Sequence, residues 1–382
     1  MLERKRVDQA SRMAARWLAK SCQVTDSADT SLGAFATGYD GGQGGFVYGP
    51  LVWHTSVAIR ALLKIHGRTK NPAWKEAAIL GGRYLESVQA EGDGGEDSGS
   101  LWGPWLGGNE PLVVDVNYRS MGGLLDLYGA TGSPHYLESS RRIADWFIGR
   151  AYKGGGTHLN RYFPDKNVLG WPRSHVLDEG SLIRLQDLTR EESYADLCRD
   201  QVEELASSLR EDGWFSCMET PRMERHPEAG PDETSPRDVY WHLSPLLMAY
   251  SKKGRKDLLK PIEVTGRLML GLQSPEGSLE SFYSKSGTGR GGSDGVATSM
   301  FVSIWLRLWE ITETGDYLEG AERGLDWMVS SQLTARRAEA FGAFSDGSSG
   351  GRDGAGSSLG SAASSFGIIA AEEYLRVINR TG

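Results

Sequence analysis

The chain has 382 residues, a formal net charge of −8 at pH 7, and 39% hydrophobic against 24% charged residues. This composition is typical of a globular protein with enough apolar surface for a large core. The negative charge argues against a nucleic-acid partner, because binding to phosphate backbones requires clustered Lys and Arg. No stretch approaches the roughly 18 consecutive apolar residues of a membrane-spanning helix, so no membrane association is predicted.

The cysteines and the N-terminal segment favour an intracellular protein. Cys22, Cys198 and Cys217 lack metal-ligand spacing, and their odd number argues against a disulfide framework. Cys22 and Cys198 fall in predicted helices, where we expect them to be buried as small hydrophobic residues. The N-terminus is charged and amphipathic and has no apolar run of the secretory kind, which predicts a cytoplasmic location. No metal or nucleotide motif is found, so no cofactor is predicted.

Amphipathic helix patterns recur along the whole chain. Apolar residues repeat at helical spacing, opposite a charged face, over residues 8–22, 72–89, 134–151, 192–210, 256–273 and 316–332. A long loop rich in glycine and aromatic residues follows each helix, and a second, more apolar helix follows the loop. These second helices are predicted to begin near Trp53-His54, Asp115, Asp178-Glu179, Asp238, Asp294 and Ser357.

The start points of the second helices are spaced by roughly 60 residues, which indicates a repeat architecture. Each repeat is a helical hairpin that cannot bury its apolar stripe alone, so neighbouring hairpins must stack. Six hairpins can close into a ring. The sequence therefore predicts one all-α catalytic domain over residues 1–382, an (α/α)6 barrel with the amphipathic helices outside and the apolar helices inside. All long loops, some with short β-strands, then lie on one rim, where we expect the binding site.

Polar and aromatic side chains gather where the predicted inner helices begin. Asp115, Asp178 and Glu179 are the candidate catalytic residues, because crowded carboxylates shift one another's pKa values and suit acid/base chemistry. Aromatic rings beside hydrogen-bonding groups suit sugar rings. The candidate substrate-binding residues are Trp53, His54, Asn117, Tyr118, Trp171, Arg173, His175, Asp238, Tyr240, His242, Arg290 and Asp294. Helix capping is the alternative role for the aspartates, and loop packing is the alternative for the aromatic residues.

Two connecting segments, LYGATGSPHYLESSRRIADWFI and LWEITETGDYLEGAERGLDWMV, resemble the repeat connectors of (α/α)6-barrel carbohydrate-active enzymes. The size and layout are most similar to the unsaturated uronyl hydrolases of glycoside hydrolase families 88 and 105. In that family two aspartates at the start of successive inner helices are functional, and one protonates the 4,5 double bond of the sugar before water adds at C5. The resemblance places Asp115 and Asp178 at these positions. The family's Arg-Gly-Asn-Gly-Trp-type segment is missing, and the fourth inner helix starts PRDVYWHL instead.

The resemblance implies a hydrolase of acidic oligosaccharides. Asp178 or Glu179 would be the general acid, and Asp115 would assist water or orient the substrate. Arg173, His175 and Arg290 are the candidates to hold a uronate carboxylate. The expected partner is an oligosaccharide, and the expected state is a monomer or homodimer.

Three alternatives stay open. The first is a polysaccharide lyase or an epimerase on the same barrel, in which Tyr240 and His242 abstract the proton beside the carboxylate. The second is a non-catalytic glycan-binding ring. The third rests on Gln89, Gln273 and Gln332, which precede glycine-containing segments and resemble the Gln-Trp repeats of terpene cyclases.

Overall fold

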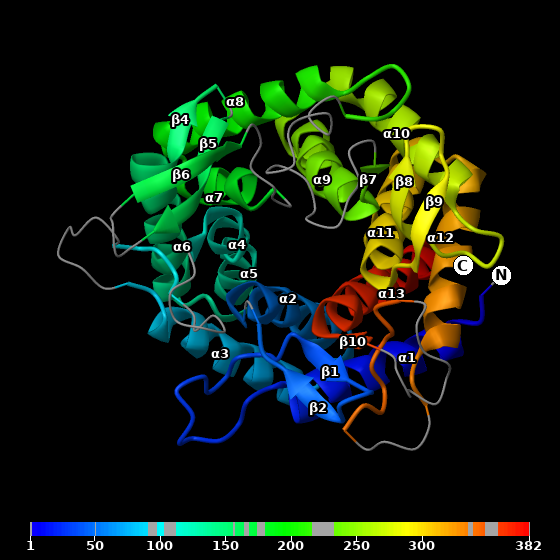
Figure 1. Ribbon diagram of the computed structural model, residues 1–382, viewed down its shortest axis with the longest axis horizontal. Coiled ribbons are helices and arrows are strands. Elements are labelled where there is room, and N and C mark those ends of the chain that lie inside the picture. The colour runs from blue at the N-terminus through cyan, green and yellow to red at the C-terminus, as the bar shows by residue number, and fades with distance from the viewer. Residues whose placement is uncertain are drawn as a thin grey trace.

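The protein is described by a computed structural model over residues 2–49, 51–90, 98–102, 112–155, 157–163, 168–173, 180–215, 233–334, 339–347 and 358–381. In these residues the helices form two concentric rings (Figure 1). The outer ring contains α1 (Arg4–Trp17), α3 (Pro72–Ser87), α6 (Pro134–Trp146), α8 (Glu192–Ser208), α10 (Leu259–Leu272) and α12 (Gly315–Ser331). The inner ring contains α2 (Leu51–Thr69), α4 (Val114–Arg119), α5 (Met121–Thr131), α7 (Ser181–Thr189), α9 (Pro236–Lys253), α11 (Gly295–Thr312) and α13 (Ser361–Thr381). The predicted (α/α)6 barrel is confirmed.

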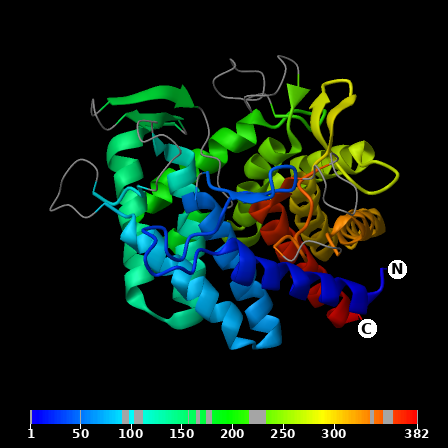
Figure 2. The ribbon, with the colours of Figure 1, turned by 60° about the horizontal axis from the view of Figure 1, so that its bottom comes forward.

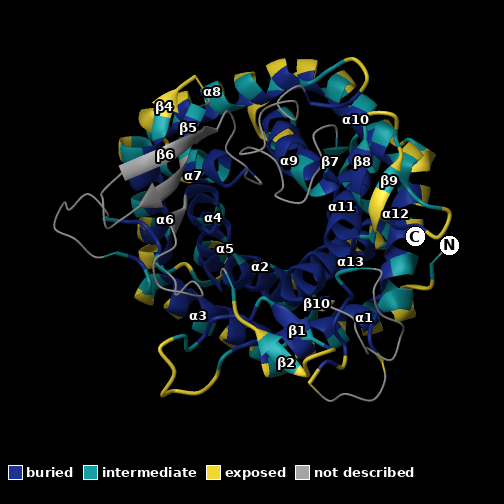
Figure 3. Ribbon diagram, in the orientation of Figure 1, coloured by how far each residue is buried: buried dark blue, intermediate teal, exposed yellow. Residues whose placement is uncertain are grey.

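The two rings differ in burial as the hydrophobic patterns predict. Every residue of α11 from Gly295 to Leu306 is buried, whereas α8 buries a single stripe that includes Tyr194, Leu197 and Val202. Figure 3 shows the same contrast, with dark blue inner helices and outer helices that alternate between buried and exposed. Because α13 packs against both α2 and α11, the last inner helix closes the inner ring.

The second inner helix departs from the predicted single helix, because it breaks at Ser120 between α4 and α5. At this break, the Ser56 side chain of α2 makes two hydrogen bonds to the α4–α5 backbone. Its hydroxyl donates to the Ser120 carbonyl at 3.0 Å and accepts the backbone N–H of Gly123 at 3.0 Å. A Cβ atom at Gly123 would lie 2.8 Å from the Ser56 hydroxyl oxygen, so only glycine permits this approach.

The outer ring is held together by a repeated glutamine contact. The side-chain amide of Gln89, after α3, donates to the carbonyl of Gly99 in the following loop and to that of Ser139 on α6. Three further glutamines make the equivalent pair of bonds, namely Gln23, Gln273 and Gln332. Gln332 bonds to Ala10 of α1, so the contact also joins the last outer helix to the first. The glutamines that resemble cyclase repeats thus connect neighbouring outer helices.

Short strands lie together at one end of the barrel (Figure 2). The first sheet has the order β10-β1-β2, formed by β1 (Gly38–Asp40), β2 (Gly45–Val47) and β10 (Ser358–Gly360). The second contains β3 (Leu112–Val113), β4 (Tyr152–Gly154), β5 (Thr157–Phe163) and β6 (Val168–Arg173), and the third has the order β7-β8-β9, with β7 (Glu233–Thr234), β8 (Glu280–Ser284) and β9 (Gly289–Ser293). All pairings are antiparallel. Pairing of β1 with β10 links the first and last repeats, and the strands mark the loop-bearing rim.

The predictions for the cysteines and for membrane-spanning helices can be compared with the structure. Cys22 and Cys198 are buried, as predicted, while Cys217 lies outside the described residues. Among the helices in the described ranges, none combines the length and the apolar character needed to cross a bilayer.

Candidate active site

The first turns of the inner helices lie at the strand-bearing end of the barrel, which is called the mouth below (Figures 1 and 2). An aromatic layer lies across this region. The Trp241 ring of α9 contacts the Trp53 ring of α2 at 6.1 Å and the Phe366 ring of α13 at 6.1 Å. Tyr240 contacts Phe366 at 5.8 Å. Helices on different sides of the barrel thus contribute rings to one layer.

A guanidinium group lies on this layer. Arg119, in the last turn of α4, places its Cζ atom 4.6 Å from the Trp241 ring centre and 5.6 Å from the Trp53 ring centre. Such positions over the face of tryptophan are favourable for a cation. The Arg119 Nε donates to the Asp115 carbonyl one turn earlier, at 3.3 Å. Asp115 and Arg119 are therefore one helical turn apart on α4, and the Arg119 side chain reaches the aromatic layer.

Asp115 is the candidate catalytic carboxylate that the structure describes. Its Oδ1 lies 3.0 Å from Nε2 of His158 on β5, and the two side chains are 1% and 0% exposed. His158 packs against Phe147 with a ring separation of 5.6 Å. With Nε2 protonated, the imidazole donates this hydrogen bond to the Asp115 carboxylate. A residue of the rim sheet therefore fixes the orientation of Asp115.

His54, one turn into α2, is a neutral imidazole with a defined tautomer. Its Nδ1 lies 2.7 Å from the Ser361 hydroxyl, which donates its own proton to the Thr37 carbonyl at 2.9 Å. The Ser361 oxygen must then accept from Nδ1–H, so the lone pair of His54 is on Nε2. Burial, aided by the positive charge of Arg237, lowers the pKa of His54 to about 3.

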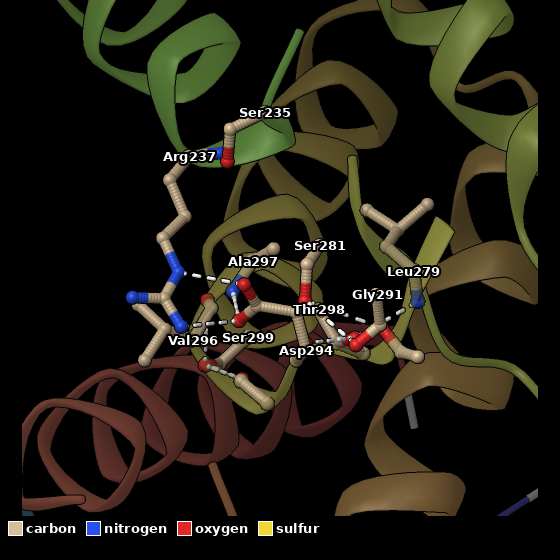
Figure 4. Close-up of polar contacts among 12 residues, drawn as sticks. Ser235, Arg237, Leu279, Ser281, Gly291, Asp294, Val296, Ala297, Thr298 and Ser299 are labelled. Atoms are coloured by element: carbon tan, nitrogen blue, oxygen red, sulfur yellow. Dashed lines mark hydrogen bonds and ion pairs between the residues drawn. The ribbon is translucent and has the colours of Figure 1, made fainter. Parts of the chain in front are cut away.

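Asp294 and Arg237 connect two inner helices at the mouth (Figure 4). Arg237, in the first turn of α9, donates from Nε and Nη2 to the two carboxylate oxygens of Asp294 at 2.7 and 2.9 Å. Asp294 also caps α11 by accepting the backbone N–H of Ala297 at 2.9 Å. Asp346 adds a second negative charge near Arg237. The capping alternative is confirmed for Asp294, and the same carboxylate forms a bidentate ion pair.

Asp238 is not a helix cap, because Ser235 caps α9 by accepting the N–H of Arg237 at 3.3 Å. The Asp238 carbonyl instead accepts a hydrogen bond from Nδ1 of His242 at 2.5 Å. The lone pair of a neutral His242 ring then lies on Nε2. Acidic residues thus stand at three different positions at the starts of α4, α9 and α11.

Three predicted substrate-binding residues contact outer-ring residues, a loop or another strand of the same sheet. Tyr118 does not reach the mouth, because its fully buried ring packs against Phe147 and its hydroxyl donates to Gln201 of α8. Asn117 holds the preceding loop, since its amide group bonds to both the N–H and the carbonyl of Leu101. Arg290 on β9 is exposed and pairs through two nitrogens with Glu233 of β7.

Several predicted residues cannot be placed. Asp178, Glu179 and His175 lie outside the described residues, and Trp171 and Arg173 lie on β6 in a part whose side chains are not described. Their predicted roles remain predictions. Within the described residues, no group of three or more His, Cys, Asp or Glu side chains is arranged to hold a metal ion.

The sequence reasoning missed Arg119, His158, Arg237 and Trp241. Arg237 and Trp241 stand within the segment PRDVYWHL, so their position beside Asp238 and Tyr240 was available as a clue. Arg119 follows Asp115 by four residues, which is the spacing of neighbours on one helix face. His158 comes from a different segment of the chain, and its contact with Asp115 depends on the pairing of β3 with β5.

Comparison with known proteins bears on the fold. No protein-family model matches the sequence, and no curated protein matches it. Among solved structures, the chain is similar to an unsaturated glucuronyl hydrolase specific for heparin, with a TM-score of 0.71, 14% identity and 99% of both chains covered. Cellobiose 2-epimerase from Bacillus thermoamylovorans B4167 has a TM-score of 0.73 and 12% identity, over 97% of this chain and 98% of that chain.

A polysaccharide lyase has a TM-score of 0.63 and 13% identity, over 98% of both chains. The chain has the fold of these proteins. Unsaturated glucuronyl hydrolases are among the structures that share it, as the sequence resemblance implies. At such low identities the likeness extends to the fold, and a choice among hydrolysis, epimerisation and elimination requires the chemistry of the mouth.

Proposed function

We propose that the protein is a carbohydrate-active hydrolase for acidic oligosaccharides and that Asp115 is one of its catalytic carboxylates. The observation that carries this proposal is the placement of Asp115 one helical turn from Arg119, whose guanidinium lies over Trp53 and Trp241. Indole rings offer an apolar surface to a sugar ring, and a guanidinium beside them can bind a uronate carboxylate through two hydrogen bonds.

The His158 contact supports a role for Asp115 in this reaction. A carboxylate that accepts a hydrogen bond from His158 is held in one orientation and, as a base, can assist an attacking water molecule. A general acid must supply the second proton transfer, and we retain Asp178 or Glu179 for that role. The solved glucuronyl hydrolase of similar fold is described as specific for heparin, an acidic polysaccharide, which supports a uronate substrate.

The test uses an unsaturated uronyl disaccharide, whose conjugated double bond absorbs ultraviolet light. Hydration of the double bond removes this absorbance and adds the mass of one water molecule. Asp115→Asn is expected to lower kcat by at least about 100-fold, as loss of a catalytic proton-transfer group does. Asp145→Asn is a matched control, because Asp145 on α6 accepts a bond from Tyr194 on α8, and both helices belong to the outer ring. Full activity of Asp115→Asn would remove the assignment.

A second candidate is a sugar epimerase, which the hydrogen bonds of two histidines favour. In their neutral forms, His54 on α2 and His242 on α9 both carry the lone pair on Nε2, so each can act as a base at the mouth. Tyr240 does not share this property, because burial raises the pKa of its hydroxyl. Conversion of a sugar at constant mass, lost in His54→Asn or His242→Asn but retained in Asp115→Asn, would favour the epimerase over the hydrolase.

A further inference from the structure

A cavity of about 400 Å³ lies at the end of the barrel opposite the mouth. Its lining includes Gly129 and Ala130 from the last turn of α5, and Lys64 and Arg307 from the second halves of α2 and α11. Tyr240, which belongs to the aromatic layer, also lines it. The cavity therefore extends from the far rim toward that layer, and it is distinct from the mouth that carries Asp115 and His54.

The cavity is lined by more positive than negative side chains. Arg60, Lys64, Arg184 and Arg307 come from three inner helices, and Asp126 is the acidic residue among the described lining residues. Asp126 pairs with both Arg60, at 3.4 Å, and Arg184. One carboxylate is therefore shared between two guanidinium groups.

A second carboxylate is shared in the same way. Glu373 of α13, only 6% exposed, lies 2.5 Å from the Lys64 nitrogen and 3.5 Å from Arg307. Although burial opposes it, the charges of Lys64 and Arg307 lower the pKa of Glu373 to about 2, so its carboxylate is ionised. Glu310, which follows Arg307 by three residues on α11, pairs with Arg376 and Arg380.

Four cations around two carboxylates leave a surplus of two positive charges in a partly enclosed space. The Lys64 and Arg307 side chains are 35% and 30% exposed, so solutes can reach them. Positive charges held together in such a space attract a multivalent anion, and guanidinium groups match the oxygens of a phosphate group. The volume exceeds the roughly 30 Å³ of one liquid water molecule more than tenfold, which leaves room for a sugar ring beside a phosphate.

We propose that this cavity is a second binding site, specific for a small molecule that carries a dianionic phosphate group. The phosphate would be bound by Lys64, Arg184 and Arg307, with Arg60 keeping Asp126 in place. The group is either inorganic phosphate or the phosphate of a monosaccharide. The proposal does not depend on the reaction at the mouth, because its readout is binding.

The experiment is calorimetric titration of the full chain, in phosphate-free buffer, with inorganic phosphate, a hexose 6-phosphate and the uncharged hexose. The decisive variant is the double substitution Lys64→Gln and Arg184→Gln. It removes the charge surplus but leaves Arg307 with Glu373 and Arg60 with Asp126. We expect phosphate binding to weaken by about 100-fold, since each charge-assisted bond removed corresponds to roughly tenfold. Tighter binding of the hexose phosphate would assign the sugar-borne group, and tighter binding of inorganic phosphate would assign the free ion.

Arg255→Gln is the matched control, because Arg255 is a half-buried cation that also pairs with two carboxylates, Glu203 and Asp257, outside this cavity. It should bind phosphate as the unaltered chain does. If the double variant fails to fold, Arg184→Gln alone must weaken binding about tenfold. The proposal is overturned if neither phosphate compound binds, if the variants bind as tightly as the control, or if the uncharged hexose binds as well as its phosphate.

Discussion

His158 on β5 and Asp115 on α4 form a hydrogen-bonded pair of 3.0 Å, and their side chains are 0% and 1% exposed. The pair joins the sheet of the rim to the inner helix that carries the candidate base. A buried carboxylate depends on its hydrogen-bond donor, because a buried polar group without a partner costs free energy.

His158→Phe is therefore expected to lower the free energy of unfolding by about 1–3 kcal/mol, the cost of a buried polar group without its partner. It should also lower kcat, because the Asp115 carboxylate loses the donor that fixes its orientation. Urea unfolding and steady-state kinetics measure the two effects. His135→Phe is the control, since His135 pairs with Glu86 at the surface, where such a pair contributes less than about 1 kcal/mol. Equal losses in both variants would contradict the role of His158.

The protonation state of His54 predicts how stability depends on pH. The folded pKa of about 3 lies below the ordinary value of 6.5, so the unfolded chain binds a proton that the folded chain rejects. Stability from this group is complete above pH 6.5 and decreases as the pH falls toward 3. Between pH 6.5 and about pH 5 the loss should reach about 2 kcal/mol.

His54→Asn removes the titration and retains a donor for Ser361, so its unfolding free energy should change less over this range. Glu373 does not interfere, because its pKa of about 2, below the ordinary 4.5, affects stability only below about pH 4.5. Urea midpoints at several pH values test the difference. Parallel curves for the two proteins would show that His54 is not the group responsible.

The glutamine contacts predict a specific weakness where the outer ring closes. Gln332→Leu removes two bonds to buried carbonyls, those of Gly342 and Ala10, and should cost about 2–4 kcal/mol. Gln43→Leu, at an exposed position, should stay within about 0.5 kcal/mol. Thermal unfolding of both variants tests the prediction, which fails if Gln332→Leu melts together with the control.

The short connections between inner and outer helices offer a stabilising substitution. Glu313 ends α11 with a φ of 56°, and Gly132 ends α5 with a φ of 70°, so both occupy the left-handed region. Glu313→Gly should raise the free energy of unfolding by about 0.5–1 kcal/mol, because glycine adopts this conformation without strain.

Gly132→Ala is the reciprocal test. A Cβ atom at Gly132 would meet no atom within 4 Å, so any loss reflects backbone strain alone, expected at about 1 kcal/mol. Denaturant titration of both variants should give opposite signs. Two changes of the same sign would refute the backbone explanation.

The architecture could be predicted because its information is local and repeated. The predicted outer helix at 72–89 corresponds to α3 (Pro72–Ser87), and that at 316–332 to α12 (Gly315–Ser331). Hydrophobic spacing sets these helices, and the same spacing in every repeat determines how they stack. The break at Ser120 was not predictable in this way, because it depends on Ser56 from another helix.

The site was predicted less completely for the same reason. Asp115 and His54 could be selected as candidates because they stand at helix starts that the repeat locates. Their partners, His158 and Ser361, come from distant segments, and hydrogen-bonded pairs of this kind leave no periodic pattern in one sequence. The contact between Arg237 and Asp294 likewise spans two repeats.

The pairing of β1 with β10, together with the bond from Gln332 to Ala10, gives every hairpin two neighbours. Open helical solenoids need special end units whose outer faces are polar, and a closed circle has no such ends. Removal of α1 would therefore expose two apolar surfaces at once, one on each neighbouring hairpin. A chain shortened by this one helix should aggregate rather than persist as a smaller barrel.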